Sequence, residues 1–170
     1  KVVSNNAFKG CEALESVVLG SKVESLGYRA FNGCVKLKDI NLNDNIISFS
    51  DYVFADCVSL TNVVIGKSVQ SMGVGVFSGC TNITDVEIHD GATVIGSSAF
   101  YECIKLQSVD IPNSVTSLGT DAFYGCKALT RASIGNNLKV VSQNAFKGCE
   151  ALESVVLGSK VESLGYRAFS

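Results

Sequence analysis

Residues 1–31 read KVVSNNAFKGCEALESVVLGSKVESLGYRAF, and the same stretch returns as residues 139–169. Thirty of the 31 positions are identical, and the one difference replaces Asn5 by Gln143. The two copies begin at Lys1 and Lys139, and this offset of 138 is six times 23. The near-identity of the two stretches predicts a duplicated 138-residue unit that is built from six smaller repeats.

Two residue types mark the 23-residue period along the whole chain. Phenylalanine occupies one position of every repeat: Phe8, Phe31, Phe54, Phe77, Phe100, Phe123, Phe146 and Phe169. Cysteine occupies another: Cys11, Cys34, Cys57, Cys80, Cys103, Cys126 and Cys149. A fixed period of this size is typical of solenoids, whose small units bury their apolar side chains only by stacking on their neighbours. We therefore expect a single array over residues 1–170, with about seven 23-residue coils.

Each repeat contains two short stretches with strand character. In the first copy, Val17 and Leu19 alternate with more exposed positions, as a half-buried strand requires. A polar corner follows at residues 20–22, and its counterpart in the next copy is Asn43-Asp44-Asn45. Residues 23–26 then form a second, shorter extended stretch. Parallel stacking of such coils predicts a β-rich solenoid.

A turn with the pattern Phe-x-x-Cys, most often Ala-Phe-x-Gly-Cys, closes the repeat. In residues 27–34 we expect one short helical or 3₁₀ turn, ended by a left-handed glycine at Gly33. Asp56 and Glu102 replace this glycine in two copies. The sequence therefore predicts that the left-handed backbone is not needed in those two coils.

Composition excludes several classes of partner. The 14 basic and 16 acidic residues nearly cancel, and no basic cluster occurs, which disfavours nucleic acid and anionic membrane surfaces. No apolar run approaches the roughly 18 residues of a membrane helix, so no membrane insertion is expected. The single histidine, His89, lacks a fixed nucleophilic partner, and no motif for a cofactor is complete. We expect no catalytic residues, no metal site and no cofactor.

The evenly spaced cysteines have three possible explanations. They do not form the paired spacing of zinc ligands, and a disulfide framework would leave one of the seven unpaired. Neighbouring coils could bring their Cα atoms within bridging distance, but parallel side chains would keep the Cβ atoms too far apart. A column of buried free thiols, acting as small apolar side chains, fits the spacing better than disulfides or metal ligation.

The frame of the repeat resembles the leucine-rich repeats of the BspA, or Treponema pallidum, type. One copy carries it through these residues: Cys103, Leu106, Val109, Ile111, Pro112, Val115, Leu118, Gly119, Ala122 and Phe123. The resemblance implies a right-handed leucine-rich-repeat superhelix, a secreted or cell-surface location, and a role in adhesion or recognition. The chain departs from ordinary leucine-rich repeats in having no regular asparagine ladder: the corresponding column reads Lys22, Asn45, Ser68, Gly91, Ser114, Asn137 and Lys160.

The outward positions of the first strand carry the functional signal of the sequence. They change from copy to copy, whereas the inward positions stay apolar, as in a scaffold with a variable face. The candidate binding residues are Asp39, Asn41, Asn62, Val64, Asp85, Glu87, Asp110 and Arg131. Asp85, Glu87, Asp90 and Asp110 are expected to form an acidic patch, with Val64 and Arg131 at its flanks. A merely solvated face is the alternative.

Two functions remain open from the sequence. The first is a non-catalytic module that binds a protein or glycan through the strand face. The second is a structural rod or fibre whose arrays self-associate end to end, which the 138-residue duplication favours. We also expect the array to be part of a longer one, and Tyr101 and Tyr124 to stack as a second contact surface.

Overall fold

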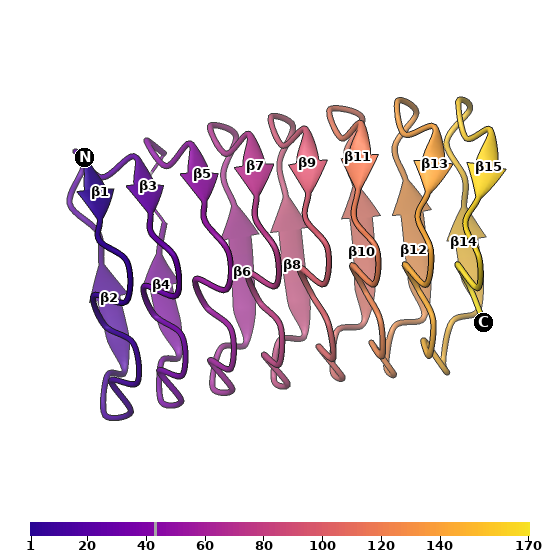
Figure 1. The fold of residues 1–170 in the computed structure, drawn as a ribbon. Coiled ribbons are helices and arrows are strands. Elements are labelled where there is room, and N and C mark those ends of the chain that lie inside the picture. The colour runs from indigo at the N-terminus through magenta and orange to yellow at the C-terminus, as the bar shows by residue number, and fades with distance from the viewer. Residues whose placement is uncertain (43) are drawn as a thin grey trace.

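The structure is a computed structural model that describes residues 1–42 and 44–170. It is a parallel β-solenoid whose coils follow one another along a single axis, with the two ends of the chain at opposite ends of the stack (Figure 1). The described residues contain no helix. Asn43, assigned above to a polar corner, lies outside the described residues.

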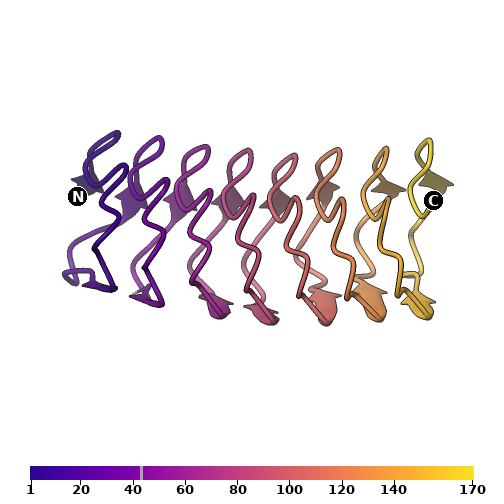
Figure 2. The ribbon, with the colours of Figure 1, turned by 90° about the horizontal axis from the view of Figure 1, so that it is seen from below.

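Each coil contributes strands to two rows, which lie on different sides of the stack (Figure 2). The first row contains β2 (Ser16–Val18), β4 (Asp39–Asn41), β6 (Asn62–Ile65), β8 (Asp85–Ile88), β10 (Ser108–Ile111), β12 (Arg131–Ile134) and β14 (Ser154–Val156). The second row contains β1 (Val2–Val3), β3 (Ser25–Leu26), β5 (Ser48–Phe49), β7 (Ser71–Met72), β9 (Val94–Ile95), β11 (Ser117–Leu118), β13 (Val140–Val141) and β15 (Ser163–Leu164).

All strand pairs are parallel and join residues one repeat apart. Val2 pairs with Ser25 in the second row, and Asn62 pairs with Asp85 in the first. The second row is continuous from β1 to β11, and β13 pairs with β15. The first row is divided into β2–β4, β6–β8 and β10–β12–β14. The predicted period therefore sets the register of every one of these pairs.

The phenylalanine column forms the centre of the core. Consecutive rings stack with centroids 5.0–5.4 Å apart and their planes within 14° of parallel. The rings from Phe31 to Phe146 are fully buried. Inward aliphatic side chains such as Leu60, Ile65 and Leu106 surround them. The column predicted from the sequence is confirmed.

The cysteine column is a column of free thiols. Five of the seven cysteines are buried, and each of the six after Cys11 places its Sγ 3.1–3.3 Å from the carbonyl oxygen of a phenylalanine in the preceding coil. Cys57, for example, donates to Phe31. The same carbonyl also accepts a backbone hydrogen bond from the cysteine of its own coil, as Phe31 O does from Cys34 N at 3.2 Å, so the thiol supplies its second donor. Burial raises the pKa of the Cys57 and Cys149 thiols to about 12.

The closing turn differs from the expected helical or 3₁₀ turn. Its N–H groups alternate between two directions: Asn32 N bonds within the turn to Arg29 O at 3.2 Å, whereas Phe31 N and Gly33 N reach carbonyls of the next coil. The distance from Phe31 N to Val53 O is 2.9 Å. A helix would aim all its N–H groups one way, so the third hydrogen-bonded row between coils replaces it.

The residue before the cysteine has a left-handed backbone in every described coil. The expectation that Asp56 and Glu102 do not need this conformation was therefore wrong. Their φ angles are 60° and 55°, close to the 73° of Gly33. The reason is the hydrogen bond to the next coil: Asp56 N donates to Ser78 O at 2.8 Å, and Glu102 N donates to Tyr124 O at 2.7 Å. Both residues adopt a strained left-handed backbone, and this conformation keeps the hydrogen bond to the next coil.

Replacing Glu102 by glycine is therefore expected to stabilise the array. The left-handed conformation costs a residue with a Cβ about 1–2 kcal/mol, and glycine gives back about 0.5–1 kcal/mol through its freedom in the unfolded chain. The net gain should be about 0.5–1 kcal/mol in the free energy of unfolding by urea. The matched control is Glu102→Ala, which keeps the Cβ and should bring no gain. Equal stability of the two variants would contradict the strain argument.

Two asparagines of the polar corner form side-chain hydrogen bonds to the preceding coil. Asn45 Nδ2 donates to Ser21 O, and Asn137 Nδ2 donates to Asn113 O, both at 2.8 Å. The other members of this column are different residue types, so these asparagine bonds do not continue. Other corners are joined by different side-chain bonds: Gly91 N donates to Ser114 Oγ at 3.1 Å, and Lys160 Nζ donates to Asn137 Oδ1 at 2.8 Å.

Candidate functional site

The first row of strands presents the candidate binding residues. All eight are exposed, and they come from β4, β6, β8, β10 and β12. The parallel register places Val64 beside Glu87, and Asp110 beside Ser133. Val64 is 50% exposed, so an apolar side chain lies on an otherwise polar face. The alternation predicted from the sequence correctly assigned these positions to the surface.

The expected acidic patch is partly neutralised. Arg131 does not merely flank it, because its guanidinium binds both carboxylate oxygens of Asp110, at 2.7 and 3.0 Å. This hydrogen-bonded pair raises the pKa of Arg131. His89 Nε2 lies 2.7 Å from Glu87 Oε1. Asp85 accepts a hydrogen bond from the Thr84 hydroxyl at 3.1 Å and has no cationic partner in the described part of the chain.

A hollow of about 410 Å³ lies on the first row between β4 and β6. Its lining residues are Asp39, Ile40, Asn41, Leu42, Asn62 and Val64. The structure thus brings four of the eight candidate residues together around one concavity. The other four lie on β8, β10 and β12. A second hollow, of about 280 Å³, shares Leu42 and Val64 and extends to His89.

Sequence analysis missed Ile40 and Leu42 as surface residues. They occupy inward positions of the repeat, where Val63 and Ile65 of the next coil are only 3% and 0% exposed. Both are half-buried here and line the hollow. No sequence signal marks them, because their residue types fit the core pattern.

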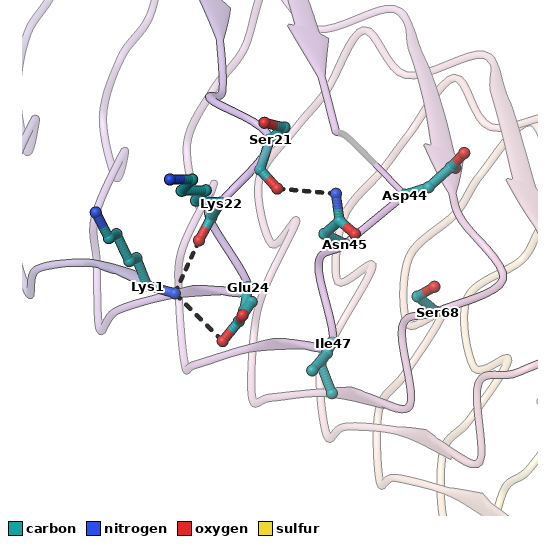
Figure 3. Close-up of a pocket in the computed structure, with 8 residues that line it drawn as sticks. All are labelled: Lys1, Ser21, Lys22, Glu24, Asp44, Asn45, Ile47 and Ser68. Atoms are coloured by element: carbon teal, nitrogen blue, oxygen red, sulfur yellow. Dashed lines mark hydrogen bonds and ion pairs between the residues drawn. The ribbon is translucent and has the colours of Figure 1, made fainter.

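A larger hollow, of about 480 Å³, lies at the polar corner near the beginning of the stack (Figure 3). It is lined by Lys1, Ser21, Lys22, Glu24, Asp44, Asn45, Ile47 and Ser68. The backbone nitrogen of Lys1 lies 2.8 Å from Lys22 O and 3.2 Å from the Glu24 carboxylate (Figure 3). Its charges are of both signs and partly satisfy each other, so this corner offers no single recognisable ligand chemistry.

The tyrosine pair lies elsewhere in the coil, in the closing turns. The rings of Tyr101 and Tyr124 stack with centroids 4.9 Å apart and planes 6° from parallel. Lys147 Nζ lies 5.4 Å from the Tyr124 ring centroid, at cation–π distance. The predicted stacking is confirmed, and a role in ligand contact stays a prediction.

Within residues 1–42 and 44–170, no group of three or more His, Cys, Asp or Glu side chains could hold a metal ion. The same residues contain no helix with the length and apolar character needed to span a membrane.

Comparison with known proteins shows similarity to leucine-rich repeat proteins. The family model for the BspA type leucine rich repeat region matches in six copies, over residues 1–130 and 74–170. A leucine-rich repeat protein of Treponema pallidum is 33% identical with a TM-score of 0.69, over 96% of this chain and 66% of its own. None of the curated proteins searched matches.

Two further solved structures are similar. A leucine-rich cell surface protein of Faecalibacterium prausnitzii is 26% identical with a TM-score of 0.72, over 96% of this chain and 54% of its own. A leucine-rich repeat protein of Eubacterium ventriosum is 20% identical with a TM-score of 0.90, over 99% of this chain and 45% of its own. The chain spans about half to two thirds of the length of these proteins. With the family model matching along its whole length, the chain belongs to the BspA-type leucine-rich repeat family.

Proposed function

We propose that this array is a non-catalytic binding module of a secreted or cell-surface protein, and that it presents the first row of strands to a protein or glycan. One observation carries the proposal: the outward positions of this row differ between coils, whereas the inward positions are uniformly apolar. The column on the outward side reads Val18, Asn41, Val64, Glu87, Asp110, Ser133 and Val156. A uniform scaffold under a varied surface provides rigidity and specificity together.

The chemistry of the row favours a partner with basic groups and some apolar surface. Asp39 and Asp85 have no cationic partner among the described residues, and Val64 offers an exposed apolar contact between them. Because the strands are held by the stacked core, little conformational entropy is lost when a partner binds. The similar cell surface protein of Faecalibacterium prausnitzii supports the proposed location.

The test is a variant with Asp85, Glu87 and Asp110 replaced by alanine. The three substitutions remove the carboxylates of the middle coils and release Arg131 from its ion pair. We expect binding of the purified array to cells or extracellular matrix to fall at least tenfold in a plate assay. The control is the triple variant E12A/E150A/E162A, which changes the net charge equally but away from the first row. Equal effects of both variants would contradict a site on this row.

The second candidate is a rod that self-associates end to end. Backbone N–H groups at the ends of the strands donate toward the preceding coil, as Glu24 N does to Lys1 O at 2.7 Å. Those of the turns donate toward the following coil, as Phe8 N does to Ala30 O at 2.7 Å. The two ends of any such stack therefore carry complementary donors and acceptors. Filaments that lengthen with protein concentration in electron micrographs would favour the rod over the monomeric module.

A further inference from the structure

One backbone hydrogen bond between coils is missing from the first row. At the start of β4, β8, β10, β12 and β14, an N–H donates to the equivalent carbonyl of the preceding coil. These bonds are Lys38 N to Glu15 O at 2.9 Å, Thr84 N to Thr61 O at 2.8 Å, Gln107 N to Thr84 O at 3.2 Å, Thr130 N to Gln107 O at 2.9 Å, and Glu153 N to Thr130 O at 2.9 Å. Among the described residues, Thr61 N makes no such bond to Lys38 O.

The missing hydrogen bond is part of a wider gap between β4 and β6. These strands are not paired, whereas β2 pairs with β4 and β6 pairs with β8. On the other side of the same coils, β5 and β7 remain paired through Ser48 and Ser71. In Figure 1, β6 stands visibly farther from β4 than from β8. The two coils are therefore splayed on the first row only.

The gap leaves two kinds of group without their usual partner. The facing edges of β4 and β6 carry backbone donors and acceptors that other coils use to pair, such as Thr61 N–H and Lys38 C=O. Ile40 and Leu42, which would be core residues in a closed pair, line the 410 Å³ hollow. An unpaired strand edge beside accessible apolar surface is a template for another extended chain.

Charge defines the rim of the gap. Asp39 makes no ion pair or side-chain hydrogen bond in the described part of the chain, and neither does Asp44. The neighbouring Lys38 is turned away, with its Nζ 3.2 Å from Glu15 Oε2. Lys67 borders only the adjoining hollow. The rim at Asp39 thus favours a basic group.

We propose that the gap between β4 and β6 accepts an extended peptide of a partner protein as a guest strand. The peptide backbone pairs with the free edges of β4 and β6, and an apolar side chain packs on Ile40 and Leu42. A lysine or arginine next to it binds Asp39, because adjacent side chains of an extended chain point to opposite faces. This inference rests on the proposed function, since it uses the same row, and it specifies the class of partner.

The second break in the row, between β8 and β10, does not have these features. Gln107 N still bonds to Thr84 O there. The 410 Å³ hollow lies at β4–β6, and the 280 Å³ hollow lies between Leu42 and His89. The guest strand is therefore assigned to the β4–β6 gap alone.

The probe is an acetylated and amidated hexapeptide of alternating valine and lysine, titrated into the ¹⁵N-labelled array. We expect the Thr61 amide signal to shift on titration and its hydrogen exchange to slow. Without peptide, the Thr61 amide should exchange faster than the bonded amide of Thr84. Replacing lysine by glutamate, or methylating alternate backbone nitrogens of the peptide, should lower the affinity at least tenfold, because these changes remove the charge match or the strand pairing.

The variant Asp39→Asn should lower the affinity threefold to tenfold. Its matched control is Glu153→Gln, which removes an exposed carboxylate just before β14 in the closed β12–β14 pair and should change the affinity less than twofold. Both side chains are exposed, so the fold should be retained, as circular dichroism can verify. No binding at millimolar peptide, equal binding of the methylated peptide, or a protected Thr61 amide in the free protein would each overturn the guest strand.

The two proposals fail separately. If the peptide does not bind but the Asp85, Glu87 and Asp110 variant still loses its attachment to cells or matrix, the guest strand is wrong and the binding row stands. If the peptide binds as expected but that variant keeps its attachment, the gap is a peptide site and the middle coils are not the adhesive surface.

Discussion

Raising the pH from 8 to 11 is expected to lower the free energy of unfolding of the array steeply. Burial raises the pKa of the Cys57 thiol from its ordinary 9.0 to about 12, and that of Cys149 equally. It raises the pKa of Cys80, Cys103 and Cys126 well above 9.0. A thiol whose pKa is higher in the folded than in the unfolded state stabilises the fold as long as the pH is below the unfolded pKa. This contribution to the free energy of unfolding is lost as the pH rises through the unfolded pKa toward the folded pKa.

The size of the effect follows from proton linkage. Between pH 9 and 12, each thiol is ionised in the unfolded chain but neutral in the fold. Each such thiol lowers the free energy of unfolding by about 1.4 kcal/mol per pH unit. Several thiols act together, so the free energy of unfolding in urea, measured under reducing conditions, should fall steeply over this window. Tyrosine and lysine also titrate here, which makes a cysteine variant necessary as a control.

The control is Cys57→Ala, which removes one buried thiol from the column. Its stability at pH 7 should be lower, because the hydrogen bond to Phe31 O and some packing are lost. Its slope against pH above 9 should be shallower by about 1.4 kcal/mol per pH unit. Identical slopes for the variant and the parent protein would show that the buried thiols do not cause the alkaline loss.

Replacing Phe77 by alanine is expected to destabilise the array by about 3–5 kcal/mol. The ring is fully buried and stacks on Phe54 and Phe100, each at 5.4 Å, with the Phe49 ring edge-on at 6.3 Å. Removing it leaves a cavity between three coils that the rigid phenylalanine column cannot close. Urea unfolding followed by circular dichroism gives the change in the free energy of unfolding.

The matched control is Phe8→Ala at the end of the same column. Phe8 is 41% exposed and stacks on one ring only, Phe31, at 5.0 Å. Its removal should cost about 1–2 kcal/mol, because less apolar area is lost from the core. If the two variants were equally destabilised, the central stack would not be the main source of cohesion between coils.

Together, these predictions separate the scaffold from the surface. The phenylalanine and cysteine columns control the free energy of unfolding, whereas changes at Asp39, Asp85 or Glu87 should alter binding and leave stability nearly unchanged. All three carboxylates are exposed, and substitutions at such positions usually change stability by less than about 0.5 kcal/mol.

The sequence by itself determined the solenoid, its period and its core. A strictly periodic repeat without insertions allows only a stack in which equivalent residues lie above one another, so the columns of Phe31 and Cys34 had to be internal. The same alternation assigned Asn62, Val64 and Glu87 to the surface, because side chains of a strand alternate between its two faces. These features depend on local pattern and burial, which each repeat carries in full.

Only the tertiary structure decided the turn geometry, the charge pairing and the gap. Asp56 and Glu102 adopt a left-handed backbone because the next coil offers a carbonyl there, and Arg131 joins Asp110 across two strands. Ile40 and Leu42 fit the core pattern, yet they border an open hollow. Each of these depends on the spacing and orientation of two coils relative to each other, and that spacing is set by contacts between coils rather than by the residues of either coil.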